Sequence, residues 1–292
     1  MTTRHFLKDT SISPAEQAEI LELALKVKAR RWDLQPLRGP QAVAILTDKP
    51  TLRTQVSFSV GVAELGGYPL LVDGRLAGVG QRESIADTAR VLGRQVSAIV
   101  WRTYGQDRLE EMAAHAGVPV VNALTDDYHP CQVLADLLTI AEHLGGVAGL
   151  RGAKLAYLGD GSNNMAQSYL LGGALAGLEV VVATPAAYQP KAAVLAEARA
   201  VAQATGGSAR VVADPSEALA GAAAVATDTW VSMGMEDDAD SRQAPFIPYR
   251  VDQAAMSLAQ PDAIFIHCLP AYRGKEMTAE VIDGPRSRVW DE

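Results

Sequence analysis

The chain has 292 residues, 48% hydrophobic and 21% charged, which is enough for one large or two medium-sized globular domains, and two domains are expected. Its formal net charge is -8 and it has no Lys/Arg block, which argues against a nucleic-acid or anionic-membrane partner. The longest apolar stretch, 170–183, is short and interrupted by Glu179, so it is a poor membrane span. The start lacks a signal-peptide pattern, and the two cysteines fit neither a disulfide framework nor a zinc motif, so a cytoplasmic protein is expected.

The first predicted element is a helix that starts at Ser13-Pro14, with Ser as the cap and Pro at the first position, and runs to about Arg31. Short apolar runs then alternate with helical patterns. This alternation predicts an α/β fold with two doubly wound, mostly parallel sheets and ligands at the carboxyl ends of their strands. Strands are predicted at 43–46, 69–72, 98–101, 118–121, 154–158, 179–183, 209–212, 223–227 and 263–266, and further helices at 58–65, 84–92, 109–116 and 132–144.

The segment 48–55 leaves the first predicted strand and enters a helix. Backbone N–H groups at such a helix start form an anion site, and an Arg in it adds a bidentate cation. An ordinary Thr-capped helix has the same pattern. A second cation, Arg102, follows strand 98–101 and is expected at the same ligand edge, unless it forms a surface salt bridge. The candidate residues of the helix start are Thr51, Leu52, Arg53 and Thr54.

A second motif, His129-Pro130-Cys131-Gln132, stands where the predicted helix 132–144 begins. Pro at an early helical position lets the preceding His project from the helix N-terminus. A lone His in this position is more often a structural residue, so the motif as a whole carries the functional interpretation.

Three motifs of the second half follow predicted strands. The loop 158–165 contains Asn163-Asn164 but lacks the third glycine of a dinucleotide loop, so nicotinamide binding is not expected. Asp228 precedes Ser232 by four residues, a pattern that fits an ammonium site or a turn-stabilising Asx arrangement. Met233 follows directly, and the acidic run 236–240 is interpreted as a lid or a solvated loop. The last predicted strand ends in His267-Cys268-Leu269-Pro270, where a thiol at a strand end favours a site over an inert buried Cys.

Taken together, these motifs resemble the aspartate/ornithine carbamoyltransferase family over nearly the whole chain, and most closely its ornithine-dependent type. The resemblance implies a carbamoyltransferase-like pair of sheet domains with a cleft between them, no cofactor and no metal. Arg102, His129 and Cys268 would be catalytic. Ornithine would be bound by Asn164, Asp228, Ser232 and Met233, and carbamoyl phosphate by Thr51, Leu52, Arg53, Thr54, Arg102, His129, Gln132, Cys268 and Leu269.

The resemblance also implies an organisation of the chain. Residues 1–132 would form the carbamoyl-phosphate-binding domain, residues 133–275 the ornithine-binding domain, and residues 276–292 a C-terminal segment returning toward the first domain. The expected partners are the small-molecule substrates carbamoyl phosphate and L-ornithine and further copies of the chain. The expected assembly is a homotrimer with sites at subunit interfaces. The expected reaction makes citrulline and phosphate, as a step of arginine biosynthesis.

At least three positions depart from the family pattern in the half that binds the donor. Leu52 replaces a Thr, Gln55 replaces an Arg, and Gly78 stands where the family has a Gln that reaches the phosphate of a neighbouring subunit. Two alternatives therefore stay open: a divergent paralogue that uses another diamino-acid acceptor or another donor, and a catalytically weak ornithine-binding protein.

Overall fold

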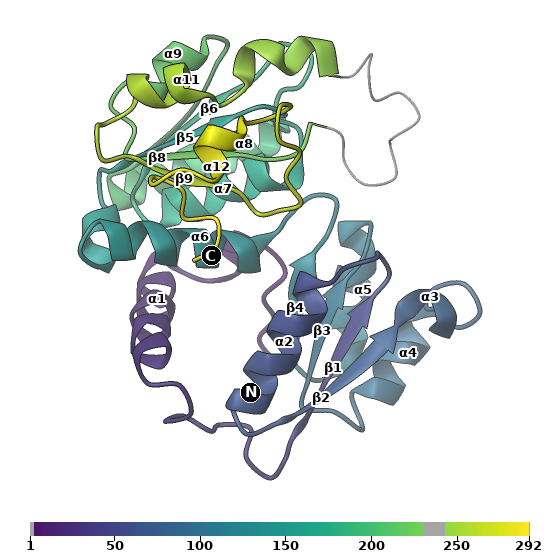
Figure 1. The fold of residues 1–292 in the computed structure, drawn as a ribbon. Helices are drawn as coiled ribbons and strands as arrows, with labels where there is room; N and C mark the ends of the chain where they lie inside the picture. Colours follow the sequence, from purple (N-terminus) through teal and green to yellow (C-terminus); the bar gives the residue numbers. More distant parts are fainter. Residues whose placement is uncertain (1–2, 231–242, 292) are drawn as a thin grey trace. The chain divides into compact units, whose positions relative to one another are not determined.

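A computed structural model describes residues 3–230 and 243–291, which form two compact units. The first unit comprises Met1–Ile12 and Glu22–Cys131, and the second comprises Ser13–Leu21 and Gln132–Glu292. Each unit contains one sheet in which every strand pair is parallel (Figure 1). The predicted α/β fold class with two parallel sheets is confirmed.

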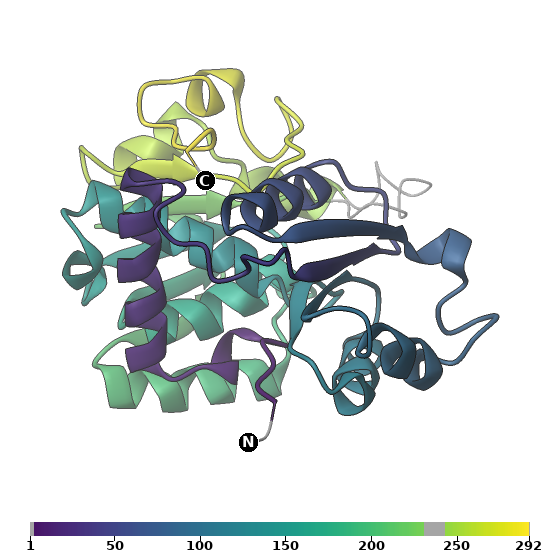
Figure 2. The same ribbon diagram turned by 90° about the horizontal axis from the view of Figure 1, so that it is seen from below.

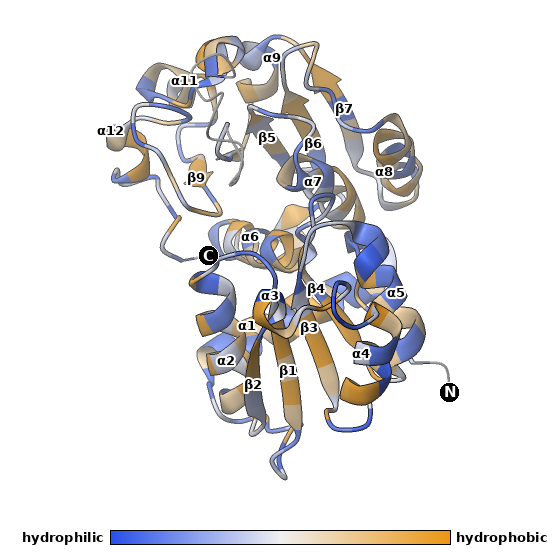
Figure 3. Cartoon of the chain, turned by 90° about the vertical axis from the view of Figure 1, so that its right-hand side faces the viewer, coloured by the Kyte–Doolittle hydropathy of each residue, from blue (hydrophilic) through white to orange (hydrophobic). Residues whose placement is uncertain are grey.

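The sheet of the first unit has the order β2-β1-β3-β4, and its central strand β1 is buried on both faces. Because side chains alternate along a strand, Val43 and Ile45 pack with helix α2, whereas Ala44 and Leu46 pack with α4 and α5. Figure 2 shows α2 on one side of this sheet and α4 and α5 on the other, and Figure 3 shows hydrophobic colours along β1 and β3. The bounds are β1 Ala42–Thr47, α2 Arg53–Glu64, β2 Tyr68–Asp73, α3 Gly74–Ala77, α4 Ile85–Leu92, β3 Ala98–Arg102, α5 Gln106–Ala116 and β4 Val120–Leu124.

The sheet of the second unit has the order β7-β6-β5-β8-β9. Strand β5 lies at its centre, and helix α7 is buried along nearly its whole length, as its apolar sequence predicts. The remaining elements of the chain are α1 Pro14–Ala29, α6 Pro130–His143, β5 Lys154–Leu158, α7 Asn164–Leu175, β6 Glu179–Ala183, α8 Ala192–Thr205, β7 Ser208–Val212, α9 Pro215–Leu219, β8 Ala224–Thr227, α11 Gln253–Leu258, β9 Ile264–Ile266 and α12 Ala279–Ile282, with short 3-10 helices at Asp9–Ser11, Val147–Leu150 and Ala244–Tyr249. Of these, Asp9–Ser11 and the part of α1 from Glu22 onward belong to the first unit.

The segment 73–80, which contains the departure at Gly78, includes the short helix α3. Asp73 caps it by accepting hydrogen bonds from the backbone N–H groups of Arg75 and Leu76. Gly78 ends the helix with φ of 70°, a left-handed conformation that disfavours a Gln at this position. The departure at residue 78 therefore has a backbone reason.

Two expectations concern other parts of the chain. The acidic run 236–240, interpreted as a lid or a solvated loop, lies outside the described residues. Within 3–230 and 243–291, no helix has the length and apolar character needed to cross a membrane.

Candidate functional site

In the first unit, the start of α2 and the end of β3 place polar groups together. The side-chain oxygen of Thr51 accepts a hydrogen bond from the backbone N–H of Thr54 at 3.4 Å. Arg102, the last residue of β3, is buried and donates from Nη1 to Oγ1 of Thr54 at 3.1 Å. Leu52 stands at the N-cap with a 72% exposed side chain, so it offers the site its backbone alone. The structure thus joins the predicted helix start to Arg102, and a guanidinium beside the N–H groups of a helix start is suited to an anion.

The charges of Arg102 and Arg53 also act on His129. Burial, followed by the positive charges of Arg102 and Arg53, lowers the pKa of His129 to about 3. At neutral pH the imidazole is therefore uncharged, so it presents one N–H donor and one acceptor nitrogen. A neutral imidazole beside guanidinium groups suits an electrophilic donor to a carbonyl oxygen better than a general acid.

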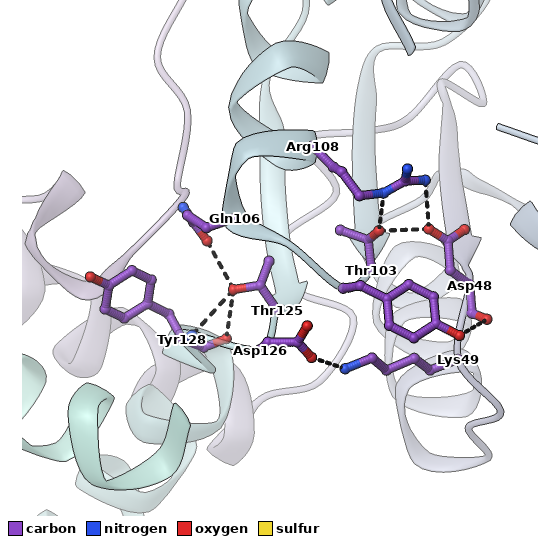
Figure 4. A network of polar contacts seen from close by, with 9 residues as sticks. Asp48, Lys49, Thr103, Gln106, Arg108, Thr125, Asp126 and Tyr128 are labelled. Atoms are coloured by element: carbon purple, nitrogen blue, oxygen red, sulfur yellow. Dashed lines mark hydrogen bonds and ion pairs between the residues drawn. The ribbon is translucent and has the colours of Figure 1, made fainter. Parts of the chain in front are cut away.

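The turns after β1, β3 and β4 are joined by a polar network that the sequence analysis missed (Figure 4). Thr103 donates to Oδ2 of Asp48 at 2.6 Å, and Arg108 donates to Oγ1 of Thr103 at 3.1 Å. Thr125 donates to Gln106 at 2.8 Å and accepts from the backbone N–H of residue 128, immediately before His129. Asp48 and Thr103 directly follow neighbouring parallel strands, which is the signal that would have found them.

In the second unit, the carboxylate of Asp228 follows β8 and is held on several sides. Asn163 donates from Nδ2 to Oδ2 of Asp228 at 3.2 Å and to the hydroxyl oxygen of Tyr157 at 2.9 Å. The backbone N–H of Thr229 donates to Oδ1 at 2.7 Å, and the thiol of Cys268 donates to the same oxygen at 3.3 Å. The structure thus brings together the predicted residues Asp228 and Cys268.

Burial raises the pKa of Asp228, and the neighbouring His267 and the hydrogen bonds from Thr229 and Cys268 act in the opposite direction. A carboxylate in this setting gains from a cation that enters beside it, because the cation compensates the lost hydration. The site is therefore suited to an ammonium group.

The turn after β9 presents Leu269 in an unusual conformation. Its φ is 55°, in the left-handed region that a branched side chain rarely adopts. The backbone N–H of Leu269 donates to Nδ1 of His267 at 2.9 Å, and Nε2 of His267 lies 3.4 Å from Oε1 of Glu276. Both side chains are buried, and Glu276 also accepts from the backbone N–H of Tyr272 at 2.6 Å. This pair fixes the turn that carries Cys268 and Leu269.

Not every predicted residue is placed in these contacts. Asn164 is the first residue of α7, whereas the preceding Asn163 makes the contacts with Asp228 and Tyr157. Ser232 and Met233 lie outside the described residues. Gln132 lies on α6 and donates to Asp136 at 2.9 Å. Asn163, Tyr157, His267 and Glu276 are supporting residues that sequence reasoning did not select.

Asp228, His267 and Cys268 offer three potential metal-ligand atoms within 4.8 Å of one another. Nδ1 of His267 already accepts from Leu269, and the Cys268 thiol already donates to Asp228. Because these bonds account for the cluster, its donor atoms are better explained as parts of the turn than as an ion site.

Comparisons with known proteins agree with this geometry. The family model of the aspartate/ornithine carbamoyltransferase carbamoyl-P binding domain matches residues 4–142, and that of the Asp/Orn binding domain matches residues 151–292. An ornithine carbamoyltransferase of Bifidobacterium longum subsp. infantis is 58% identical over 99% of this chain and 90% of its own length. The corresponding protein of Clavibacter michiganensis is 59% identical over 99% and 94%.

A solved structure is also similar. The ornithine carbamoyltransferase from Pyrococcus furiosus superposes with a TM-score of 0.93 at 41% identity, covering 99% of this chain and 92% of that chain. Family models that together span both units, and relatives above 50% identity along nearly the full length, leave one assignment. The chain is a member of the aspartate/ornithine carbamoyltransferase family.

Proposed function

We propose that the chain is an ornithine carbamoyltransferase, which moves the carbamoyl group of carbamoyl phosphate to the δ-amine of L-ornithine and forms L-citrulline and phosphate. The observation that carries this proposal is the contact of Arg102 with Thr54 at the start of α2, in a chain whose relatives bear that enzyme name. An anion site built from a buried guanidinium and a helix N-terminus suits the phosphate of the donor.

On the donor side, Thr51, Arg53 and Thr54 bind the phosphate, with the backbone of Leu52 adding an N–H group. Arg102 and the neutral His129 donate to the carbamoyl oxygen, and Gln132 binds the carbamoyl amide. Attack by an amine turns this oxygen into an oxyanion, and donors fixed before the reaction stabilise that charge without reorganising. The lowered pKa of His129 supports this role, since an uncharged imidazole still donates one N–H.

On the acceptor side, Asp228 binds the α-ammonium of ornithine, and Asn164, Ser232 and Met233 bind the rest of its amino-acid backbone. Cys268 and the carbonyl of Leu269 lie nearer the reacting amine and the donor amide. The role of Asp228 is supported by its three hydrogen-bond donors, which fix the orientation of its carboxylate.

The nucleophile has to be a neutral amine. An amine like that of Lys has a pKa of about 10.4, so its deprotonation at pH 7 costs about 4 to 5 kcal/mol. A carboxylate beside that amine would raise the cost, which favours placing Asp228 at the α-ammonium instead. We therefore expect kcat/KM to rise from pH 6 toward pH 9, and a flat profile over this range would contradict the assignment.

The proposed assembly is a homotrimer with sites at subunit interfaces, and an exposed apolar surface of the first unit supports self-association. On α2, exposed apolar residues recur every four positions and so form one face. Leu71 of the neighbouring edge strand β2 pairs in register with Ile45 and therefore lies on the α2 side of the sheet. We name this surface the α2–β2 face, and it consists of the exposed residues Leu52, Val56, Val60 and Leu71.

Light scattering of the purified protein tests the assembly. Three copies are expected, and Leu71→Asp in the α2–β2 face should yield smaller species because it buries a charge at the contact. Leu258→Asp, an equally exposed position on α11, is the matched control. A monomeric wild type would contradict the trimer.

The product L-citrulline makes arginine biosynthesis in the cytoplasm the proposed setting.

The reaction itself is tested by measuring citrulline and phosphate formed from carbamoyl phosphate and L-ornithine, beside calorimetric binding of each ligand. Equal amounts of both products are expected. Ornithine binding without citrulline formation would contradict the proposed transfer.

A further inference from the structure

A buried carboxylate lies one helical turn beyond Gln132 on α6. Asp136 is fully buried, and its Oδ1 accepts a hydrogen bond from Nε2 of Gln132 at 2.9 Å. Its Oδ2 accepts from the hydroxyl of Tyr169 on α7 at 2.5 Å. Tyr169 is itself buried and packs against the ring of Tyr157 at a centroid distance of 5.8 Å. Both oxygens of Asp136 are thus held between two rigid helices.

This arrangement decides which way the amide of Gln132 points. The NH₂ group of Gln132 faces Asp136, because it is Nε2 that donates to the carboxyl oxygen Oδ1. The amide oxygen Oε1 then lies on the other side of the amide group, as an acceptor directed away from Asp136. The reverse orientation would set two oxygens against each other, which costs a hydrogen bond and adds repulsion.

We propose that Asp136, held by Tyr169, is a positioning residue that makes Gln132 selective for a donor with an N–H group. This inference rests on the proposed function, in which Gln132 binds the carbamoyl amide. Carbamoyl phosphate and acetyl phosphate have nearly the same size and charge. The first carries an NH₂ group on its carbonyl carbon where the second carries a CH₃ group. An outward Oε1 accepts a hydrogen bond from the first and gains nothing from the second.

The test compares two stable probes, phosphonoacetamide and 2-oxopropylphosphonate, which carry the amide and the methyl ketone. Calorimetry gives the ratio of their dissociation constants, and this ratio does not depend on turnover or on the fraction of folded protein. The wild type should prefer the amide. In Asp136→Asn the residue at 136 offers both a donor and an acceptor, so either orientation of Gln132 is satisfied and the preference should fall about fivefold.

Three further variants complete the design. Tyr169→Phe leaves the bond between Asp136 and Gln132 in place and should change the preference less than about twofold. Thr139→Val, a buried change on the same helix, should leave it unchanged and controls for loosened packing. Gln132→Met removes the amide and should abolish the preference, and it still tests the proposal if Asp136→Asn fails to fold.

The proposal is overturned if the wild type binds both probes equally, or if Asp136→Asn or Gln132→Met keeps the wild-type ratio. A fall in preference in Thr139→Val as large as in Asp136→Asn would overturn it as well. A wild type that prefers the amide but forms no citrulline would contradict the proposed transfer and leave the selection by Asp136 standing.

Discussion

The two units present opposite charges by different means. The first unit collects cations and N–H groups at a helix start, with Arg102 bonded to Thr54 and the neutral His129 close by. The second unit collects a carboxylate and a thiol after two neighbouring strands, with Asp228 accepting from Cys268. An anion site gets much of its potential from backbone groups, whereas an ammonium site depends on one side chain and on what holds it.

This difference decides where each site is vulnerable. The helix N-terminus of the first unit survives the change at Leu52, because the backbone N–H groups are independent of the side chain. The Asp228 site depends more on side chains, because its carboxylate is one and the donors Asn163 and Cys268 are others, although the N–H of Thr229 is backbone. Substitutions of side chains should therefore separate the two units.

The largest effect is expected at the one side chain on which the donor site depends most. Arg102→Ala should lower kcat/KM for carbamoyl phosphate by about 10³, because it removes a buried guanidinium from the developing oxyanion. Initial rates of citrulline formation measure the loss. Arg90→Ala, which removes an exposed guanidinium paired with Asp87, is the matched control. An Arg102→Ala enzyme within tenfold of the wild type would contradict the role.

A smaller effect is expected from loosening Asp228. Asn163→Ser keeps an N-cap for α7 but loses the amide donors to Asp228 and Tyr157. The KM for ornithine should rise about tenfold, since a hydrogen bond to a charged group contributes about 1.5 to 3 kcal/mol. Steady-state kinetics measure this, with Asp252→Ser at the cap of α11 as the control. An unchanged KM would show that Asn163 acts as a cap alone.

The sequence predicted the features that depend on local patterns and missed those that depend on contacts between distant residues. The strands and the helix start at 51–54 were found because apolar periodicity and a helix start are local patterns, although the fourth strand is Val120–Leu124 and not the predicted 118–121. Asp228 and Cys268 were found through motifs at strand ends. Glu276 was missed because its contact with His267 depends on how the chain after β9 folds back, which no local pattern encodes. Asn163 was not selected, since only the cap geometry of α7 shows that its amide faces Asp228, and the role of Asn164 stays a prediction.

A still smaller effect is expected from the pair that fixes the Leu269 turn. Glu276→Gln keeps the acceptor for the backbone N–H of Tyr272 but weakens the contact with His267. We expect kcat to fall about fivefold and the free energy of unfolding to drop by about 1 kcal/mol. Urea unfolding and initial rates measure both. Glu280→Gln, an exposed change on α12, is the control, and a kcat equal to that of the wild type would mean that the turn holds without the pair.

The last prediction concerns the pH dependence of stability rather than activity, and it depends on His129 of the first unit. The pKa of His129 is lowered from 6.5 to about 3 in the folded protein, so between these values the unfolded chain binds a proton that the folded chain does not. This contribution to stability is complete above pH 6.5 and is lost as the pH falls toward 3. His129→Gln removes the contribution, so the free energy of unfolding should fall less steeply from pH 7 to pH 4 than in the wild type. Urea unfolding at each pH measures the slope, with the exposed His115→Gln as the control, and parallel slopes for wild type and His129→Gln would mean that His129 is charged in the fold.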